Sequence, residues 1–161
     1  MATLRQANDD DLERVDAFYR GEGFGSEASS DHVIYLAEDE GEIAGVVRLV
    51  PVEDYLVLRG MMVRSAYRRQ GIGKGLLAAL VPHMDGQTVY CLPWAHLEDF
   101  YAGAGFETIP LEDCPNVLRD RLDRHFQRLA DPAIQQSMQT YLEVSFPDGL
   151  DIRIMKRHAR L

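Results

Sequence analysis

The sequence predicts a mixed α/β (α+β) domain in which helices flank a mostly antiparallel central sheet and a helical insertion precedes the last strand. Three β-rich runs at residues 32–38, 43–50 and 55–63, separated by short turns, are typical of an antiparallel meander. A helical run then leads to a short apolar strand at 88–92, and a connection through a helix favours a parallel strand pair. The 161 residues are enough to bury a core, so we expect one domain over residues 1–161.

The first elements are a strand over residues 3–7 and a helix with recognisable start and end signals. Asn8 is a good N-cap, and the three aspartates that follow it favour a helix N-terminus. Gly21 ends the helix, and its apolar stripe consists of Leu12, Val15, Phe18 and Tyr19. Residues 21–31 are rich in Gly and Ser, which predicts a loop that either covers a binding site or only connects two elements.

Two turns join the β-rich runs, and a helix follows the third run. Residues 39–42 give a hairpin signal, and residues 51–54 predict a second turn. The helix begins at about Gly71 and should end or kink near Val81, because Pro82 has no N–H to donate. Its apolar face is Ile72, Leu76, Leu77, Leu80 and Met84.

The C-terminal third predicts a brief helix over 95–103, a strand that begins at 104–107 and a helical insertion over 111–146. The first insertion helix begins at Pro115 and carries Leu118, Leu122, Phe126 and Leu129 on one face. A second helix restarts at Asp131 and Pro132 and carries Ile134, Met138 and Tyr141. A turn at 147–149 leads to the last strand, at 150–156.

Composition and charge exclude several classes of protein. The formal net charge of −9 makes nucleic acid an improbable partner, and an amine-bearing small molecule suits that field better. No apolar run reaches the roughly 18–20 residues of a membrane span, and the N-terminus lacks a signal-peptide core, so we expect no membrane partner and a cytoplasmic location. Two cysteines imply no disulfide framework, and the five histidines show no metal-binding spacing, so we expect no metal.

A glycine-rich turn between the run at 55–63 and the helix carries the clearest chemical signal. Gly71 and Gly73 let an anion approach the backbone at a helix N-terminus, while Arg68, Arg69 and Lys74 bring full positive charges. This combination predicts a pyrophosphate cradle. A P-loop would need Ser or Thr after the lysine, where this chain has glycine, and a dinucleotide fingerprint would need a different glycine spacing.

The spacing that fits is [R/Q]-x-x-G-x-G, filled by Arg68, Gly71 and Gly73. It resembles the acetyl-CoA-binding motif of the GCN5-related N-acetyltransferases, the GNAT family. A second segment also resembles that family, with an aromatic residue and Tyr at a helix end, then a small residue and Gly-Phe. Here these positions are Phe100, Tyr101, Ala104, Gly105 and Phe106. In element order the resemblance covers residues 3–110 and the last strand.

The resemblance implies acetyl-CoA as co-substrate and assigns roles to particular residues. Backbone groups at Met61, Met62 and Val63 should meet the pantetheine arm and the acetyl carbonyl. Tyr101 should protonate the departing CoA thiolate, and a phenol with a pKa near 10 is a competent donor for that step. A tyrosine packed only in the core is the alternative. The pyrophosphate should be held by Arg68, Arg69, Gln70, Gly71, Ile72, Gly73 and Lys74.

Two departures from the family pattern leave the general base open. Many relatives carry Asn seven residues before the tyrosine, where this chain has Trp94, and the run at 55–63 has Arg59 but no acid. Cys91 lies within an apolar strand and has no histidine partner, so we interpret it as a buried structural thiol. The candidate bases are Glu53, Glu98, His96 and His32, or a water chain to one of them.

The leading hypothesis is therefore an N-acetyltransferase that transfers the acetyl group of acetyl-CoA to a primary amine of a small molecule or peptide, by direct attack in a ternary complex. The alternative is an acetyl-CoA sensor without turnover, which Tyr101 disfavours. A relative that acetylates charged tRNA should have a basic face, which the net charge of −9 disfavours. The insertion at 111–146 should pack over the acceptor side or form a homodimer contact.

Overall fold

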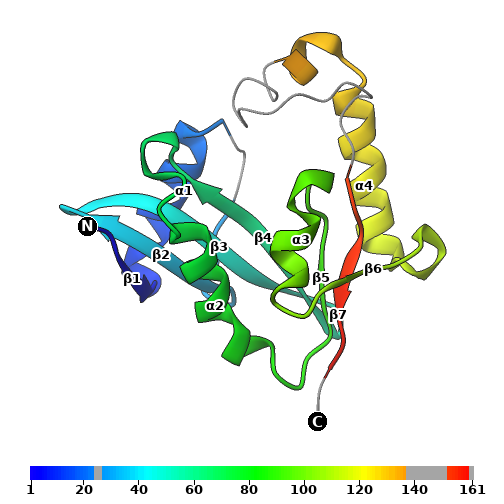
Figure 1. Ribbon diagram of the computed structural model, residues 1–161, viewed down its shortest axis with the longest axis horizontal. Coiled ribbons are helices and arrows are strands. Elements are labelled where there is room, and N and C mark those ends of the chain that lie inside the picture. Colours follow the sequence, from blue (N-terminus) through cyan, green and yellow to red (C-terminus); the bar gives the residue numbers. More distant parts are fainter. Residues whose placement is uncertain (24–26, 137–151, 160–161) are drawn as a thin grey trace. The chain divides into compact units, whose positions relative to one another are not determined.

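The computed structural model describes residues 1–23, 27–136 and 152–159, which form two compact units (Figure 1). One unit comprises residues 1–91 with the C-terminal residues from 157 onward, and the other comprises residues 92–156. The predicted fold class is confirmed: the protein is mixed α/β, with a mostly antiparallel sheet and flanking helices. No helix within the described ranges has the length and apolar composition needed to cross a membrane.

The first unit contains a sheet with the order β1-β2-β3-β4-β5. The neighbouring pairs from β1 to β4 are antiparallel, and β4 and β5 are parallel, as the intervening helix predicted. The predicted meander and the parallel pair are thus confirmed. The strands are β1 (Thr3–Gln6), β2 (Val33–Asp39), β3 (Glu42–Val52), β4 (Tyr55–Val63) and β5 (Val89–Cys91).

The two turns of the meander differ in how well the sequence predicted them. The β2–β3 hairpin is as expected: Glu40 and Gly41 have φ values of 51° and 81°, the left-handed pair that suits a two-residue hairpin loop. The second predicted turn is too long, because β3 continues through Pro51 to its end at Val52. Pairing with β2 stops at Leu49, so Pro51 lies where β3 has a neighbour on one side only, and its missing N–H is tolerated there.

Two helices flank this sheet. A 3-10 turn (Asp9–Asp11) precedes α1 (Leu12–Gly21), with the predicted cap at Asn8 and a reciprocal bond from the Asn8 N–H to Asp11. Helix α2 (Ile72–Met84) packs against β2, β3 and β4 (Figure 1). All five residues predicted for its apolar face are buried: Ile72, Leu76, Leu77, Leu80 and Met84.

Of the two outcomes predicted near Val81, an end or a kink, the end is wrong, since the helix continues through Pro82 to Met84. Proline in the last turn removes one backbone hydrogen bond. The residues after it contribute packing in return: Met84 is fully buried, and the His83 ring lies 3.0 Å from the Tyr35 hydroxyl of β2. Burial of a methionine side chain stabilises by about 1.5–3 kcal/mol, which offsets the lost bond.

A β-bulge interrupts the ladder between β3 and β4. The register shifts between Val46 and Arg48, so that Gly60 and Met61 of β4 together oppose Val47 of β3. Gly60 adopts φ 64°, and its carbonyl accepts a hydrogen bond of 2.7 Å from the Tyr19 hydroxyl of α1. The bulge is therefore fastened to the helix that covers this face of the sheet.

Gly60→Ala should lower the free energy of unfolding by more than the roughly 1–3 kcal/mol that a strained backbone conformation costs. A Cβ at this position would collide with the Tyr19 hydroxyl, in addition to the left-handed φ. The matched control is Gly41→Ala, where φ is 81° but nothing lies within 4 Å of an added Cβ. Urea unfolding measures both. Equal losses in the two variants would contradict the packing argument.

The second unit holds the remaining elements, except that Arg157, the last residue of β7, belongs to the first unit. A 3-10 turn (Ala95–Leu97) leads into α3 (Glu98–Ala102), and β6 (Glu107–Thr108) pairs with β7 (Met155–Arg157) in antiparallel fashion. Strand β6 begins within the predicted range of 104–107. The last strand is shorter than the predicted 150–156 and begins at Met155, although Ile152 forms an isolated bridge with Trp94.

Part of the predicted insertion is described. Helix α4 (Asn116–Leu129) follows Pro115, as expected, and residues 132–136 are helical after Asp131. Leu118 and Leu122 are buried, whereas Phe126 is 44% exposed. Residues 137–146, with Met138 and Tyr141, lie outside the described residues, and the extent of the insertion stays a prediction.

Candidate active site

The turn between β4 and α2 has the backbone geometry of an anion cradle. After a 3-10 turn (Ser65–Tyr67), Arg69 and Gly71 adopt left-handed conformations with φ 63° and 81°, and α2 begins directly afterwards. The first hydrogen bond of the helix runs from the Gly75 N–H to the Gly71 carbonyl, at 2.9 Å. The N–H groups of residues 72–74 therefore precede the helix's own ladder. No side chain caps this helix end, so its partial positive charge is available to a ligand.

Glycine occupies positions 71 and 75 for different physical reasons. An added Cβ at Gly71 would meet nothing within 4 Å, so the residue is glycine because of its φ of 81° and leaves the backbone open. An added Cβ at Gly75 would come within 2.9 Å of Leu4 Cδ2 on β1. Gly75 thus allows α2 to pack closely on the sheet and needs no ligand to explain it.

The cations of the turn also divide into two groups. Arg68 is half-buried, and its Nε donates a hydrogen bond of 3.1 Å to the carbonyl of Val63 at the end of β4. Arg69 and Lys74 are exposed at the start of the helix. Arg68 therefore fastens the turn to the strand, a structural role that the motif did not predict, while the other two cations face solvent.

A second anchor of the turn was missed by sequence reasoning. The Tyr67 hydroxyl donates a hydrogen bond of 3.0 Å to Asp39 at the end of β2. This contact raises the pKa of Tyr67 and lowers that of Asp39. Nothing local in the sequence pairs these residues, because they are far apart along the chain and meet only through the sheet.

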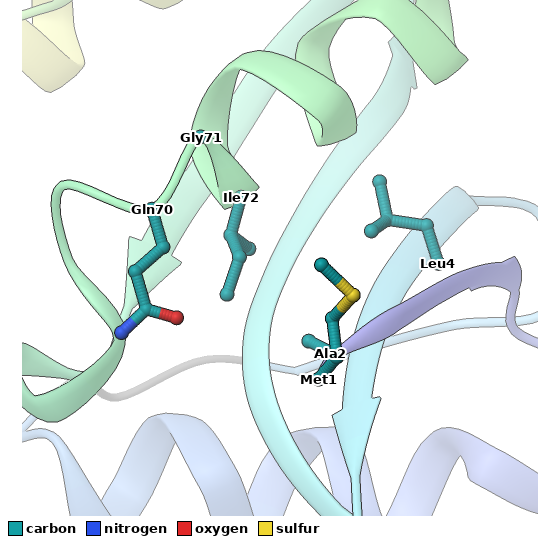
Figure 2. Close-up of a pocket in the computed structure, with 6 residues that line it drawn as sticks. All are labelled: Met1, Ala2, Leu4, Gln70, Gly71 and Ile72. Carbon is teal, nitrogen blue, oxygen red and sulfur yellow. The ribbon is translucent and has the colours of Figure 1, made fainter.

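A hollow of about 390 Å³ adjoins the start of α2, and Figure 2 shows the residues around it. One wall is the end of the cradle and the other is the chain leading into and along β1. The lining residues are Gln70, Gly71, Ile72, Met1, Ala2 and Leu4. The exposed backbone of the cradle thus borders a partly apolar recess.

The strand before the cradle is paired on one side only where it approaches the turn. The ladder between β4 and β5 pairs Leu56 with Val89 and Val57 with Tyr90, and β5 ends at Cys91. Residues 61–63 lie beyond these pairs, while Met62 and Val63 still pair with β3 on the other side. Met62 is buried in the core, whereas Met61 and Val63 are half-buried.

Tyr101, the predicted proton donor, lies on α3 in the second unit. Its side chain is 4% exposed and packs edge-to-face on Phe100 and Phe106, with ring centroids 5.0 and 6.0 Å away. Its carbonyl accepts hydrogen bonds from the N–H groups of Ala104 and Phe106, which close the turn after the helix. The second motif therefore builds a helix end around this tyrosine. The structure gathers the predicted cofactor-binding residues 61–74 in the first unit.

The candidate bases occupy different environments. Glu53 is exposed in the β3–β4 turn, and Glu98 accepts hydrogen bonds from Thr108 Oγ1 at 3.1 Å and Arg153 Nε at 2.9 Å. Burial lowers the pKa of His96. The Cys91 thiol is 2% exposed, and burial raises its pKa, so it behaves as the inert structural thiol that the sequence indicated.

His32 is the most enclosed of the candidate bases. Its side chain is 9% exposed, and its Nδ1 accepts a hydrogen bond of 3.3 Å from the Ser29 N–H. Burial, followed by the positive charge of Arg48, lowers its pKa, against the opposing charges of Asp31 and Asp16. A histidine of this kind is neutral at pH 7, the form in which an imidazole can accept a proton.

The depressed pKa of His32 predicts an acid-sensitive fold. Below the ordinary pKa of about 6.5, the unfolded chain binds a proton more readily than the folded protein, so the free energy of unfolding should fall as the pH drops through that value. His32→Asn should reduce this fall between pH 7 and 5. Urea unfolding at several pH values measures the slope, and an unchanged slope in the variant would assign the acid sensitivity to other groups.

A comparison with known protein families finds the same family that the glycine-rich turn and the segment around Tyr101 resemble. Residues 30–108 match the family model described as an acetyltransferase (GNAT) domain. That segment runs from the loop before β2 to the end of β6 and includes the cradle and Tyr101. No curated protein sequence matches the chain.

Solved structures of acetyltransferases share the fold at low identity. The ribosomal-protein-S18-alanine N-acetyltransferase of Escherichia coli is 19% identical, with a TM-score of 0.63 and 100% of this chain and 96% of that chain covered. N-acetylglutamate synthase from Neisseria gonorrhoeae, solved with coenzyme A and L-arginine, is 16% identical with a TM-score of 0.63 over 99% of this chain. This chain spans only 34% of that synthase.

NAA60 from Arabidopsis thaliana, in complex with acetyl-CoA, is 20% identical, with a TM-score of 0.52 and 68% of this chain and 86% of that chain covered. At these identities the similarity establishes the fold alone.

Proposed function

Since residues 30–108 of this chain match the model of the GNAT acetyltransferase family, we propose that the protein transfers the acetyl group of acetyl-CoA to a primary amine of a small molecule or peptide. The transfer proceeds by direct attack in a ternary complex. The observation that carries the proposal is the start of α2, an uncapped helix N-terminus behind a left-handed Gly71 and beside Arg69 and Lys74.

The cradle holds the pyrophosphate of acetyl-CoA in this proposal. The N–H groups of residues 72–74 donate to the phosphate oxygens, and Arg69 and Lys74 neutralise their charge. Arg68 supports the turn through its bond to Val63 and adds positive charge to the same site. The end of β4, residues 61–63, lies beyond the β4–β5 pairs and offers main-chain groups to the pantetheine arm and the acetyl carbonyl.

The chemistry requires a neutral amine, a polarised carbonyl and a proton for the departing thiolate. The amine nitrogen forms a bond to the thioester carbon, the C–S bond breaks, and the sulfur takes the electron pair and then a proton. Tyr101 supplies that proton, because a phenol with an ordinary pKa of about 10 is protonated at pH 7 and is closely matched to a thiol, whose ordinary pKa is about 8.5. The amine loses a proton to a base, for which the neutral imidazole of His32 is suited by its lowered pKa.

A panel of amines tests the proposal directly. The protein and acetyl-CoA are incubated with one amine at a time, chosen from amino acids, polyamines, amine-containing drugs and short peptides. Release of the free CoA thiol is measured in each case. At least one amine should accelerate CoA release far above the amine-free rate. Saturable acetyl-CoA binding with no turnover across the panel would instead favour a sensor, and absence of binding would contradict both functions.

A separate proposal is that the insertion forms a contact between two copies of the chain. The described part of α4 exposes Val117 at 38% and Phe126 at 44%, as well as Leu111 before it at 52%. These apolar side chains are consistent with a contact to a second copy. Sedimentation should then show a dimer that Phe126→Lys dissociates, and a monomer in the unmodified protein would contradict it.

A further inference from the structure

Two arginines lie directly opposite each other on β3 and β4. Arg48 and Arg59 are register partners in the antiparallel ladder, so their side chains leave the same face of the sheet, with Cβ atoms about 4.5–5.5 Å apart. Arg48 is 7% exposed. The Nε atoms of both arginines are buried and have no hydrogen-bond partner among the described residues.

No carboxylate among the described residues forms an ion pair with either arginine of this pair. The Arg48 guanidinium lies 5.1 Å from the centre of the Tyr19 ring, and one of its terminal nitrogens donates to the Glu27 carbonyl at 3.2 Å. Neither contact supplies a negative charge. The arginine ion pairs found among the described residues belong to other arginines: Arg5, Arg14, Arg64, Arg153 and Arg157.

This arrangement is unfavourable for the unliganded fold. Arginine stays charged at every physiological pH, and like charges directly opposite on a sheet destabilise it. A buried charge without a partner adds a desolvation cost. One anion between the two guanidiniums would remove both costs, and a carboxylate matches the planar fork of an arginine through two parallel hydrogen bonds.

The arginine pair lies beside the part of β4 that the proposed function assigns to the acetyl group. Arg59 directly precedes the bulge at Gly60, and at a rise of about 3.3 Å per residue it is roughly 6–7 Å along the strand from Met61. An anion held there would sit within one small molecule's length of an amine placed at residues 61–63.

We propose that Arg48 and Arg59 bind a carboxylate of the acceptor, so that the substrate is an amine of the amino-acid type. This inference rests on the proposed function, and it deepens that function by naming the acceptor class. The acceptor's charge is then opposite in sign to the pair that receives it, although the chain as a whole is acidic.

Matched acceptors test the proposal with the full-length protein. L-amino acids are compared with the amides of the same amino acids, which keep the amine and side chain but lack the carboxylate. The free acids should have kcat/KM values at least 10²-fold higher, because the amides leave the buried Arg48 and the half-buried Arg59 without an anionic partner. A preference for the amides, or for phosphoethanolamine over every amino acid, would overturn the carboxylate assignment while leaving the acetyl transfer intact.

Arg59→Gln supplies the second arm. It should raise KM for the preferred amino acid by 10-fold or more, leave the acetyl-CoA affinity unchanged, and maintain or increase the free energy of unfolding, because one of two opposed charges is gone. Arg20→Gln, which removes an exposed positive charge from the same unit, should leave KM unchanged. A less stable Arg59→Gln variant with unchanged KM would show a structural arginine and overturn the inference.

A binding measurement tests the carboxylate site independently of acetyl transfer. In the presence of CoA, millimolar L-amino acid should raise the melting temperature of the unmodified protein but not of Arg59→Gln. If no amine is acetylated, the proposed function fails. The shift in melting temperature still shows whether the two arginines bind a carboxylate. No amino-acid-dependent shift in the unmodified protein would overturn the site itself.

Discussion

Gly71→Val should nearly abolish acetyl-CoA binding. In the unmodified protein, acetyl-CoA at about 100 times its Kd should stabilise the fold by roughly 2.7 kcal/mol. Gly71 has a φ of 81°, and the space around its Cα is open. A valine here would both strain the backbone and place its branched side chain where phosphate oxygens must approach the N–H groups of α2. The stabilisation by acetyl-CoA, measured by thermal unfolding, should therefore disappear.

The backbone strain itself needs a control, and Gly86 provides it. Gly86 has a φ of 76°, nothing lies within 4 Å of an added Cβ, and the residue follows the other end of α2. Gly86→Val should lose about 1–3 kcal/mol through strain, as Gly71→Val does, but should keep the full response to acetyl-CoA. Equal responses in the two variants would contradict the assignment of the cradle to the pyrophosphate.

Tyr101→Phe should lower kcat by about 10²-fold, the usual contribution of a general acid, with little change in acetyl-CoA affinity. The substitution removes one oxygen and preserves the edge-to-face contacts with Phe100 and Phe106. The groups proposed to bind the cofactor lie in residues 61–74 and are unaffected. The measurement is kcat with a saturating amine, together with acetyl-CoA binding on the same sample.

A structural role for Tyr101 makes the opposite prediction, in which stability falls and kcat per folded molecule is retained. Tyr35→Phe is the matched control, because it also removes a single hydroxyl, here one that lies 3.0 Å from His83. That control should change stability slightly and kcat not at all. Full turnover by a folded Tyr101→Phe protein would leave solvent as the proton donor.

The sequence by itself determined the features that depend on neighbouring residues. The Asn8 cap, the Glu40-Gly41 hairpin and the glycine-rich start of α2 are all present, because each rests on local backbone preferences and on hydrogen bonds within a few residues. The pattern of strands, turns and helices along the chain also predicted the fold class and the position of the cradle. The spacing of the apolar positions in α2 was sufficient to name its buried face.

Only the tertiary structure decided the features in which distant segments meet. Pro82 stays inside α2 because burial of Met84 outweighs one lost hydrogen bond. Gly75 is explained by Leu4, 71 residues earlier in the chain. The pairing of Arg48 with Arg59 depends on the register of two strands and on a bulge that shifts it by one residue. Register reverses the face of every side chain when it slips by one, so the sequence of either strand alone could not place the two charges together.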